Sequence, residues 1–503
     1  NLVLFFGGKL HSLSIADGSI KDIPFEVDVE LELGPKLTFK YPISDEKEVL
    51  ATQIRNAVPS PDGSQLAFTA LNKLYVQDFP NGSPKRLTNS NVIEAEPTWS
   101  PDGKYITYVT WEEEDGGNIY KIEPKARRPR AEKLTAESGF YSQPAWSYTS
   151  DKIVFLTGSK FDYQSSGTGG SFFSAADDIA WIPSDGGSKT FIDKRKRRTT
   201  PHFVKGNDRI YMTDNDGQLV SLRWDGTDVK EHVKITGIST YGTTDPVTAS
   251  EASVLMMAPE GDKVLAQVNN EIYTATVPVT GSVVKISVSN PDGAAFPAKK
   301  LTVIGGEFPR WSGDSDKVHW SLGKGHFIYN LSNSEAFADS VKVAKKAEKE
   351  AKEDKKDSDE KMDNDSDSDS KKEEKEKEPS EYQAEEYRIE VSFNKDIPEG
   401  KALLKGARII TMNGDEVIEN GDILIENNRI KAVGASGSLN VPSGVEEINL
   451  KGKTVVPGFV DTHAHLSVTR GIHKIQPASY AANLAYGVTT TRDPQTGTTD
   501  VLT

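Results

Sequence analysis

Apolar and polar residues alternate in short runs through the first 330 residues, and each run follows a turn signal. The stretches "QLAFTA" (65–70) and "YITYVT" (105–110) alternate in this way and are rich in β-branched and aromatic residues, which is typical of strands. Both follow Ser-Pro-Asp-Gly, in which proline fixes φ while aspartate and glycine tolerate a tight bend. A second strand such as "KLYVQD" (73–78) completes the hairpin. The pattern predicts a chain of antiparallel hairpins.

The hairpins recur as a repeat. With Pro61 as the anchor, equivalent positions are 101, 148, 205, 259 and 313, which are about 40 to 57 residues apart. One such sheet cannot bury both of its faces, but blades packed around an axis can. Aligning Lys9 with Lys73 adds a partial unit at the start of the chain. We therefore predict a mainly β protein with a six- or seven-bladed β-propeller over residues 1–340, the first blade being incomplete.

A highly charged segment follows the repeats. Residues 344–380 contain 11 Lys and 15 Asp or Glu, and Met362 is the one large apolar residue. The stretch "AKKAEKEAKEDKK" favours a transient helix through Glu–Lys pairs, whereas the acidic part cannot bury enough apolar surface to fold. We predict a charged, disordered linker or insertion over 341–386. The next stretch, "YRIEVSF" (387–393), is a strand that either closes the propeller or leads into the next domain.

The C-terminal hundred residues show a change of pattern. Short alternating strands are predicted at 402–411, 422–426, 429–433 and 446–450, with a tight turn at Asn427-Asn428. These strands predict a small β-sandwich within residues 387–453. From residue 454 an apolar strand, "TVVPGFVD", precedes a helical stretch, "PASYAANLAYG", and a second buried strand, "VTTTRD". This order predicts the first βαβ unit of a parallel (β/α)8 barrel, truncated within residues 454–503.

Composition narrows the classes of function. A length of 503 residues suggests two or three domains, and the net charge of −15 argues against a nucleic-acid partner. The basic run at 194–198 fits either a nucleic-acid patch or a solvated strand end, and we favour the strand end. No apolar run is long enough to predict a membrane span. Because the sequence has no cysteine, a metal site would have to use His, Asp, Glu or a modified Lys.

Two other sequence features give no support for a catalytic or phosphate-binding site. The Gly-rich stretch within 161–178 lacks the context of a phosphate loop, and we expect a long inter-strand loop that lies over a neighbouring domain. No Gly-x-Ser-x-Gly motif indicates a serine hydrolase.

Two histidines at the end of the apolar strand are the candidate metal ligands. Because side chains alternate along a strand, Asp461, His463 and His465 should point to one face, at the active-site rim of a barrel. Neutral imidazoles so placed can share a Zn²⁺ ion. The alternative is a pair of partly exposed histidines without a ligand. We expect His473 to face solvent, Asp461 to pack or support the site, and leave the direction of Asp493 open.

Two family resemblances rest on these motifs. Trp99-Ser100-Pro101-Asp102-Gly103 matches in full the repeat of WD40-like propellers of the TolB and tricorn type, and Trp146 and Trp311 keep its first residue. Residues 401–503 resemble the amidohydrolase superfamily, in its imidazolonepropionase- and prolidase-like branch, through "LLKGARIITMNG", "PGFVDTHAH" and "GVTTTRD". The resemblance implies that His463 and His465 bind a divalent metal, with one or two Zn²⁺ ions expected. Its catalytic residues and remaining ligands would lie beyond Thr503 and stay unknown.

The resemblance implies part of an enzyme that hydrolyses C–N bonds of amides, cyclic amides or dipeptide-like substrates through metal-activated water. The propeller would gate access or present a small amide or short peptide, and residues 1–503 alone would be inactive. The remainder of the barrel, in the same or another chain, is an expected partner, and a homo-oligomer is compatible with the sequence. The alternative is a non-catalytic propeller that binds or scaffolds. The missing cysteines and the propeller type favour a periplasmic or secreted bacterial protein, although the sequence fixes neither compartment nor substrate.

Overall fold

The chain contains two compact units, residues 1–46 and 47–503. The structure, a computed structural model, describes residues 1–30, 44–165, 175–238, 249–280, 282–359, 381–465, 471–474 and 477–494. The first unit holds a three-stranded antiparallel sheet of β1 (Leu2–Phe6), β2 (Lys9–Leu13) and β3 (Ile20–Ile23). These strands cover the stretch that was predicted to be an incomplete blade.

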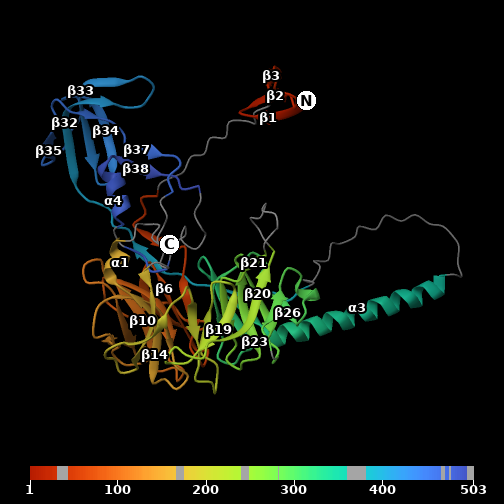
Figure 1. Cartoon of the computed structure of the whole chain (residues 1–503). Helices are drawn as coiled ribbons and strands as arrows, with labels where there is room; N and C mark the ends of the chain where they lie inside the picture. Colours follow the sequence, from red (N-terminus) through yellow and green to blue (C-terminus); the bar gives the residue numbers. More distant parts are fainter. Residues whose placement is uncertain are drawn as a thin grey trace. The chain divides into compact units, whose positions relative to one another are not determined.

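Six sheets of the second unit are arranged as the blades of a propeller (Figure 1). In chain order their strands are β5 (Arg55–Pro59), β6 (Gln65–Ala70), β7 (Lys73–Asp78) and β8 (Lys85–Arg86) in blade 1; β9 (Ile93–Trp99), β10 (Ile106–Trp111), β11 (Asn118–Ile122) and β12 (Glu132–Lys133) in blade 2; and β13 (Phe140–Trp146), β14 (Lys152–Gly158), β15 (Asp178–Pro183) and β16 (Thr190–Lys194) in blade 3.

Blades 4 to 6 follow the same order, with two extra strands on blade 4. They comprise β17 (Thr199–His202), β18 (Ile210–Thr213), β19 (Gln218–Leu222), β20 (Lys230–Gly237), β21 (Ser250–Glu251) and β25 (Val284–Ser287) in blade 4; β22 (Val254–Met257), β23 (Lys263–Val268), β24 (Glu271–Thr276) and β26 (Ala298–Lys300), with the short helix η1 (Pro291–Gly293), in blade 5; and β27 (Glu307–Trp311), β28 (Lys317–Leu322), β29 (Gly325–Asn330) and β30 (Glu385–Arg388) in blade 6.

The ring closes between blades 6 and 1. The first strands of blades 1 to 5 contact one another in order, β23 of blade 5 contacts β27 of blade 6, and β27 and β28 contact β5. The charged segment lies inside blade 6, because α3 (Leu331–Asp359) separates β29 from β30, its last strand. Strand β31 (Ser392–Asn394) then pairs with β4 (Glu48–Leu50). The stretch "YRIEVSF" therefore closes the propeller. The boundary predicted at residue 341 lies within α3, and residues 360–380 lie outside the described part.

The turn motif explains why each unit forms a hairpin. All six anchor positions lie between the first and second strands of a blade. In blade 1 the Asp62 carboxylate accepts hydrogen bonds from the Ser60 hydroxyl (2.5 Å) and the Ser64 backbone N–H (3.0 Å), and Gly63 takes a positive φ of 70°. The Ser60 hydroxyl is the main cause that lowers the pKa of Asp62. The prediction of a mainly β propeller is thus confirmed, with six blades in the described residues.

Tryptophans of the motif join neighbouring blades. The indole N–H of Trp99 donates to the Val58 carbonyl at 3.1 Å, and that of Trp311 donates to the Met256 carbonyl at 3.0 Å. Both side chains are almost completely buried, so each combines apolar burial with a satisfied donor. Their place in the repeat therefore follows from packing between blades.

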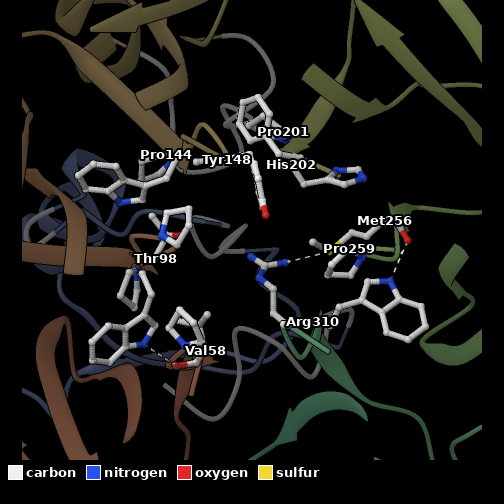
Figure 2. Close-up of a pocket in the computed structure, with 18 of the residues that line it drawn as sticks. Val58, Thr98, Pro144, Tyr148, Pro201, His202, Met256, Pro259 and Arg310 are labelled. Carbon is white, nitrogen blue, oxygen red and sulfur yellow. Dashed lines mark hydrogen bonds between the residues drawn. The ribbon is translucent and has the colours of Figure 1, made fainter. Parts of the chain in front are cut away.

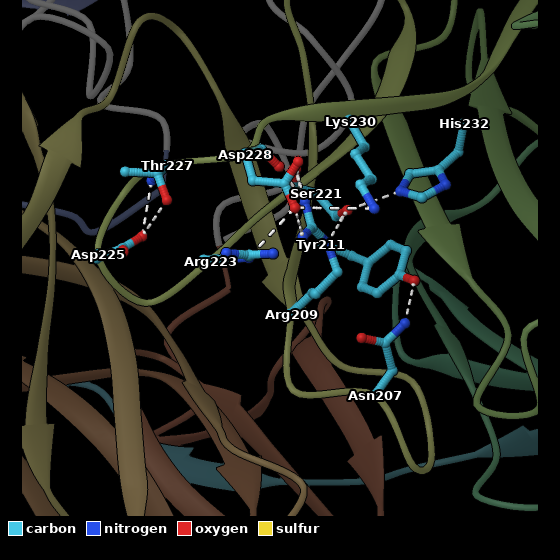
Figure 3. Close-up of polar contacts among 10 residues, drawn as sticks. All are labelled: Asn207, Arg209, Tyr211, Ser221, Arg223, Asp225, Thr227, Asp228, Lys230 and His232. Carbon is cyan, nitrogen blue, oxygen red and sulfur yellow. Dashed lines mark hydrogen bonds and ion pairs between the residues drawn. The ribbon is translucent and has the colours of Figure 1, made fainter.

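Polar groups tie together the outer strands of blade 4 (Figure 3). Arg209 donates to the Asp228 carboxylate through Nη1 and to the Ser221 hydroxyl through Nε, both at 2.8 Å. His232 Nε2 lies 2.7 Å from the same hydroxyl, and burial lowers the pKa of this histidine. The groups satisfy one another across β18, β19 and β20, and we interpret them as structural.

The basic run at 194–198 lies at the end of β16 and in the turn that follows, as expected, but it is solvated only in part, because Arg195 and Arg198 are buried. Lys194 pairs with Asp178 at 2.6 Å and Lys196 with Asp193 at 3.2 Å, while buried Arg198 also contacts Asp193. No helix in the described residues is long and apolar enough to cross a membrane.

The C-terminal strands form one sheet and one βαβ unit. The sheet contains β32 (Lys401–Ile410), β33 (Val417–Glu426), β34 (Arg429–Ala435), β35 (Glu446–Asn449) and β36 (Thr454–Val455). Asn427 takes a φ of 54° in the turn between β33 and β34, as a tight hairpin requires. Within the described residues these strands form one sheet, with no second sheet facing it.

The βαβ unit comprises β37 (Phe459–Asp461), α4 (Ala478–Ala485) and β38 (Val488–Thr491). Its two strands pair in parallel, as predicted. Phe459, Val460, Leu484 and Tyr486 are exposed, so the unit leaves apolar surface uncovered.

Candidate metal centre and propeller cavity

The candidate metal ligands follow directly after β37. Asp461 ends the strand, and its carboxylate accepts a hydrogen bond from the His463 backbone N–H at 3.1 Å. Pairing continues beyond the strands, because the Ala464 N–H donates to the Arg492 carbonyl at 2.9 Å and the Arg492 N–H donates to the Asp461 carbonyl at 2.8 Å. Both histidines thus lie at the carboxyl end of β37, beside the end of β38.

The two imidazole rings lie close together. The ring centroids of His463 and His465 are 5.1 Å apart, with the rings nearly perpendicular. His465 Nδ1 lies 3.6 Å from the Asp493 carboxylate, which follows β38. The His465 side chain is 51% exposed and that of Asp493 12%. Asp493, whose direction the sequence left open, therefore faces the histidine pair, and Asp461 supports the backbone of His463.

The donor set fits part of a metal site. Two accessible imidazoles beside a carboxylate are groups that Zn²⁺ accepts. However, no cluster of three or more such residues in suitable positions occurs in the described part of the chain. The pair alone would leave an ion with too few ligands, so the assignment of His463 and His465 as metal ligands stays a prediction.

The loop after β37 contacts the propeller. Gly471 accepts a hydrogen bond from Arg55 Nη2 at 3.1 Å, and buried Ile472 accepts one from the Tyr163 hydroxyl. The Lys474 ammonium lies 4.8 Å from the ring centre of Tyr163. Tyr163 belongs to α1 (Lys160–Ser165), the described start of the Gly-rich insertion. The expected role of that insertion as a loop over a neighbouring domain is consistent with this contact, while residues 166–174 lie outside the described part.

His473 does not face solvent, so that prediction was wrong. Its Nε2 atom is buried and has no hydrogen-bond partner among the described residues. Burial, and then the charge of Arg55, lower the pKa of His473 to about 3. The side chain is therefore neutral, and its surroundings come from the contact between the loop and the propeller, which the sequence does not encode locally.

A second candidate site is a cavity of about 740 Å³ in the propeller. The inner strands and the first turns of all six blades line it, which places it around the axis of the ring. Prolines and three motif tryptophans supply most of the apolar wall. The polar residues labelled at the cavity are Thr98, Tyr148, His202 and Arg310 (Figure 2).

Strand bulges shape the cavity wall. Five inner strands contain a residue with φ between 50° and 57°, and the register shifts there; these residues are Asn56, Glu96, Gln143, Thr200 and Phe308. Proline follows four of them, as suits a bulge where no ladder N–H is needed.

The bulges also connect neighbouring blades. The Glu96 carboxylate accepts the Gln143 backbone N–H at 2.5 Å, and the Gln143 side-chain carbonyl accepts the Thr200 N–H at 2.7 Å. His202 continues this chain of contacts, because its Nε2 accepts the Met257 N–H at 2.8 Å. Burial lowers the pKa of His202 to about 4, so the neutral form with an accepting Nε2 is maintained.

Glu96 and Arg310 are two ionisable residues of opposite charge that line the cavity. Burial raises the pKa of Glu96 to about 7, against the opposing effects of the Gln143 N–H, Arg310 and Arg55. Burial also lowers the pKa of Arg310, although a guanidinium keeps its charge.

Neither residue was predicted from the sequence as a site residue. A signal was present in "EPTW", "QPAW", "TPHF" and "FPRW", where the residue before proline takes the left-handed conformation.

Comparisons with known proteins find similarity to one propeller family and to two enzymes. The family described as TolB beta propeller domain matches residues 40–169. The chain is 39% identical over 72 residues to a dihydroorotase of Listeria welshimeri, covering 14% of this chain and 16% of the relative. It is 45% identical over 75 residues to a 5-methylthioadenosine/S-adenosylhomocysteine deaminase of Bacillus cereus, covering 14% and 17%. The chain thus spans about a sixth of these curated relatives.

Among solved structures, a putative TolB from Agrobacterium tumefaciens matches at 17% identity and a TM-score of 0.33, covering 51% of this chain and 91% of that one. TolB from Acinetobacter baumannii matches at 13% identity and a TM-score of 0.36, covering 57% and 61%. The family match, together with the six blades, shows a TolB-like β-propeller, and a short part of the chain is similar to a dihydroorotase and a deaminase.

Proposed function

We propose that this chain is part of a metal-dependent hydrolase that acts on carbon–nitrogen bonds, with a propeller that controls access of the substrate. The observation that carries the proposal is the pair His463 and His465, 5.1 Å apart at the carboxyl end of β37, with Asp493 at the end of the parallel neighbour β38. The short similarity to a dihydroorotase and to a deaminase supports this class of reaction.

His463 and His465 would hold the metal, for which we propose one or two Zn²⁺ ions. A bound divalent ion would supply Lewis-acid activation of water at neutral pH. Asp461 holds the backbone of His463, and Asp493 lies beside the ring of His465, so the two carboxylates can orient the ligands. We place the remaining ligands and the general base outside residues 1–503.

The propeller would gate the metal centre or present substrate to it. The loop that leaves β37 after the histidines is held by Arg55 of blade 1 and Tyr163 of blade 3. A substrate bound to the propeller could therefore alter the backbone next to the metal ligands. We propose a small amide or short peptide as substrate. The rest of the barrel, in the same or another chain, would cover the exposed apolar residues of β37 and α4.

Hydrolysis tests the proposal. A protein that joins these 503 residues to the rest of the barrel should hydrolyse one member of a panel of cyclic amides, including dihydroorotate, and dipeptides. His463→Ala should lower kcat/KM on the order of 1,000-fold, since several kcal/mol of transition-state stabilisation depend on the metal. His232→Asn, in blade 4, is the matched control and should keep the activity. Hydrolysis that survives both His463→Ala and a chelator would contradict the proposal.

A non-catalytic binding module is the second candidate, and the cavity of about 740 Å³ favours it. That module would bind ligands equally well with or without His463 and His465, and the longer protein would show no metal-dependent hydrolysis.

A further inference from the structure

Arg310 places a positive charge inside the propeller cavity. It lies in β27, two residues after the left-handed Phe308 and directly after Pro309. The bulge changes the alternation of side chains along the strand, and Figure 2 shows the guanidinium directed into the cavity, with the Tyr148 hydroxyl reaching in from the other side. The charge is therefore positioned by the backbone of blade 6.

The protein neutralises this charge incompletely. Arg310 Nη1 donates to the Pro309 carbonyl at 3.1 Å and contacts Met256 Sδ at 3.7 Å, a weak acceptor. Among the described residues no carboxylate lies within 4.0 Å of its nitrogens. Glu96 is the acid that interacts with it at longer range, and at neutral pH that acid is partly protonated because burial raises its pKa to about 7.

A partly buried cation without a close anion is less stable than a paired one, and a ligand that supplies the anion recovers part of that cost. A carboxylate suits a guanidinium best, because its two oxygens can accept two parallel N–H donors. Nε and Nη2 of Arg310 donate no hydrogen bond within the described residues, so these donors remain for a ligand.

The cavity wall specifies the other half of the ligand. Trp99, Trp146 and Trp311 line it, together with Phe203 and prolines of the inner strands. Such a wall favours an apolar or aromatic group next to the carboxylate. Lys205 also lines the cavity, but its ammonium group is paired with Glu260 at 2.5 Å and is therefore less available to bind an anionic ligand.

We propose that the propeller cavity binds a small molecule with one carboxylate next to an apolar group, and that Arg310 holds the carboxylate. Ligands of this class include N-acylated amino acids and the C-terminal residue of a short peptide. The site is separate from the histidine pair and does not depend on the hydrolase proposal.

Calorimetric titration of the full chain with N-acetylated phenylalanine, leucine and alanine, and with the corresponding amides, tests this proposal. We expect at least one acid to bind saturably at millimolar concentration or below, and its amide to bind between about 10-fold and 100-fold more weakly, as the loss of a charge-assisted contact implies. Arg310→Met should weaken the acid by a similar factor and leave the amide unchanged. Lys205→Met is the matched control and should bind the acid as the wild type does.

The acid–amide comparison uses the wild-type protein, so it remains decisive if a variant fails to fold. Arg310→Lys, which keeps the charge but loses the paired donors, should bind the acid with intermediate affinity. Equal affinity for acid and amide, unchanged binding in folded Arg310→Met, or no saturable binding of any of the three acids would each overturn the proposal.

Discussion

At the scale of single residues, burial determines the charge of several ionisable groups in the propeller. Glu96 holds its proton up to a pH of about 7 because of its burial. His202 and His319 show the opposite effect, since burial lowers the pKa of each to about 4 and keeps it neutral. Stability from these histidines is present above pH 6.5 and is lost as the pH falls toward about 4.

Glu96 gives the opposite dependence and can be tested alone. Its ordinary pKa of 4.5 rises to about 7 on folding, so its stabilising effect is complete below pH 4.5 and is lost as the pH rises through about 7. Glu96→Gln keeps an acceptor for the Gln143 N–H and removes the ionisation. The free energy of unfolding of this variant minus that of the wild type should therefore increase with pH across this window, by up to about 3 kcal/mol.

Denaturant titrations at several pH values measure this difference. Both proteins contain the same histidines, so the effects of these histidines on the free energy of unfolding cancel in the difference. A difference that stays constant between pH 4.5 and 7 would show that Glu96 ionises normally in the folded protein.

At the scale of elements, the loop after β37 and helix α1 form one contact. Tyr163 packs in a cluster with Trp111 and Phe140, whose ring centroids lie 4.6 Å and 4.3 Å from its own. This packing holds the ring so that its hydroxyl donates to the Ile472 carbonyl. The loop therefore contacts an aromatic cluster that packs between blades 2 and 3.

Tyr163→Phe tests this contact. It removes the hydroxyl and keeps the ring, and it should weaken the attachment of the loop by about 1 kcal/mol, the usual net value of one hydrogen bond. Amides of residues 471–474 should then exchange with solvent roughly 5-fold faster in hydrogen-exchange mass spectrometry. Tyr211→Phe, which removes a hydroxyl bonded to Asn207 in blade 4, should leave exchange in the loop unchanged. Identical exchange in all three proteins would mean that the Tyr163 hydroxyl does not hold the loop.

At the scale of the whole molecule, local sequence specifies most of the secondary structure. The recurring turns, two of which read Ser-Pro-Asp-Gly, and the alternation after them were sufficient to place all six hairpins, because turn chemistry and burial act within a few residues. The strands β32 to β35 and the parallel pair β37–β38 also lie close to the predicted ranges.

Features that depend on distant contacts were not predictable in this way. The last strand of blade 6 comes after a long charged insertion, so its partner could not be read from spacing. The low pKa of His473 depends in part on the charge of Arg55, which is more than 400 residues away in the sequence. The direction of Arg310 depends on a bulge that breaks the two-residue alternation on which strand predictions rest.

The two candidate sites divide the molecule by function. The cavity is formed by six inner strands and needs only the propeller, whereas the histidine pair lies on two strands of a βαβ unit whose apolar residues are exposed. We therefore expect ligand binding by the propeller to occur in this chain, and metal-dependent chemistry only when the barrel is complete.

The metal content of a protein that joins these 503 residues to the rest of the proposed barrel tests the central proposal most directly. After purification, exposure to Zn²⁺ and removal of unbound ions, elemental analysis should find one or two zinc ions per chain in the wild type and in His232→Asn. The double variant His463→Ala/His465→Ala should hold at least one ion fewer while keeping its circular dichroism spectrum. Equal zinc in the folded double variant and the wild type would contradict the assignment of these two histidines as metal ligands.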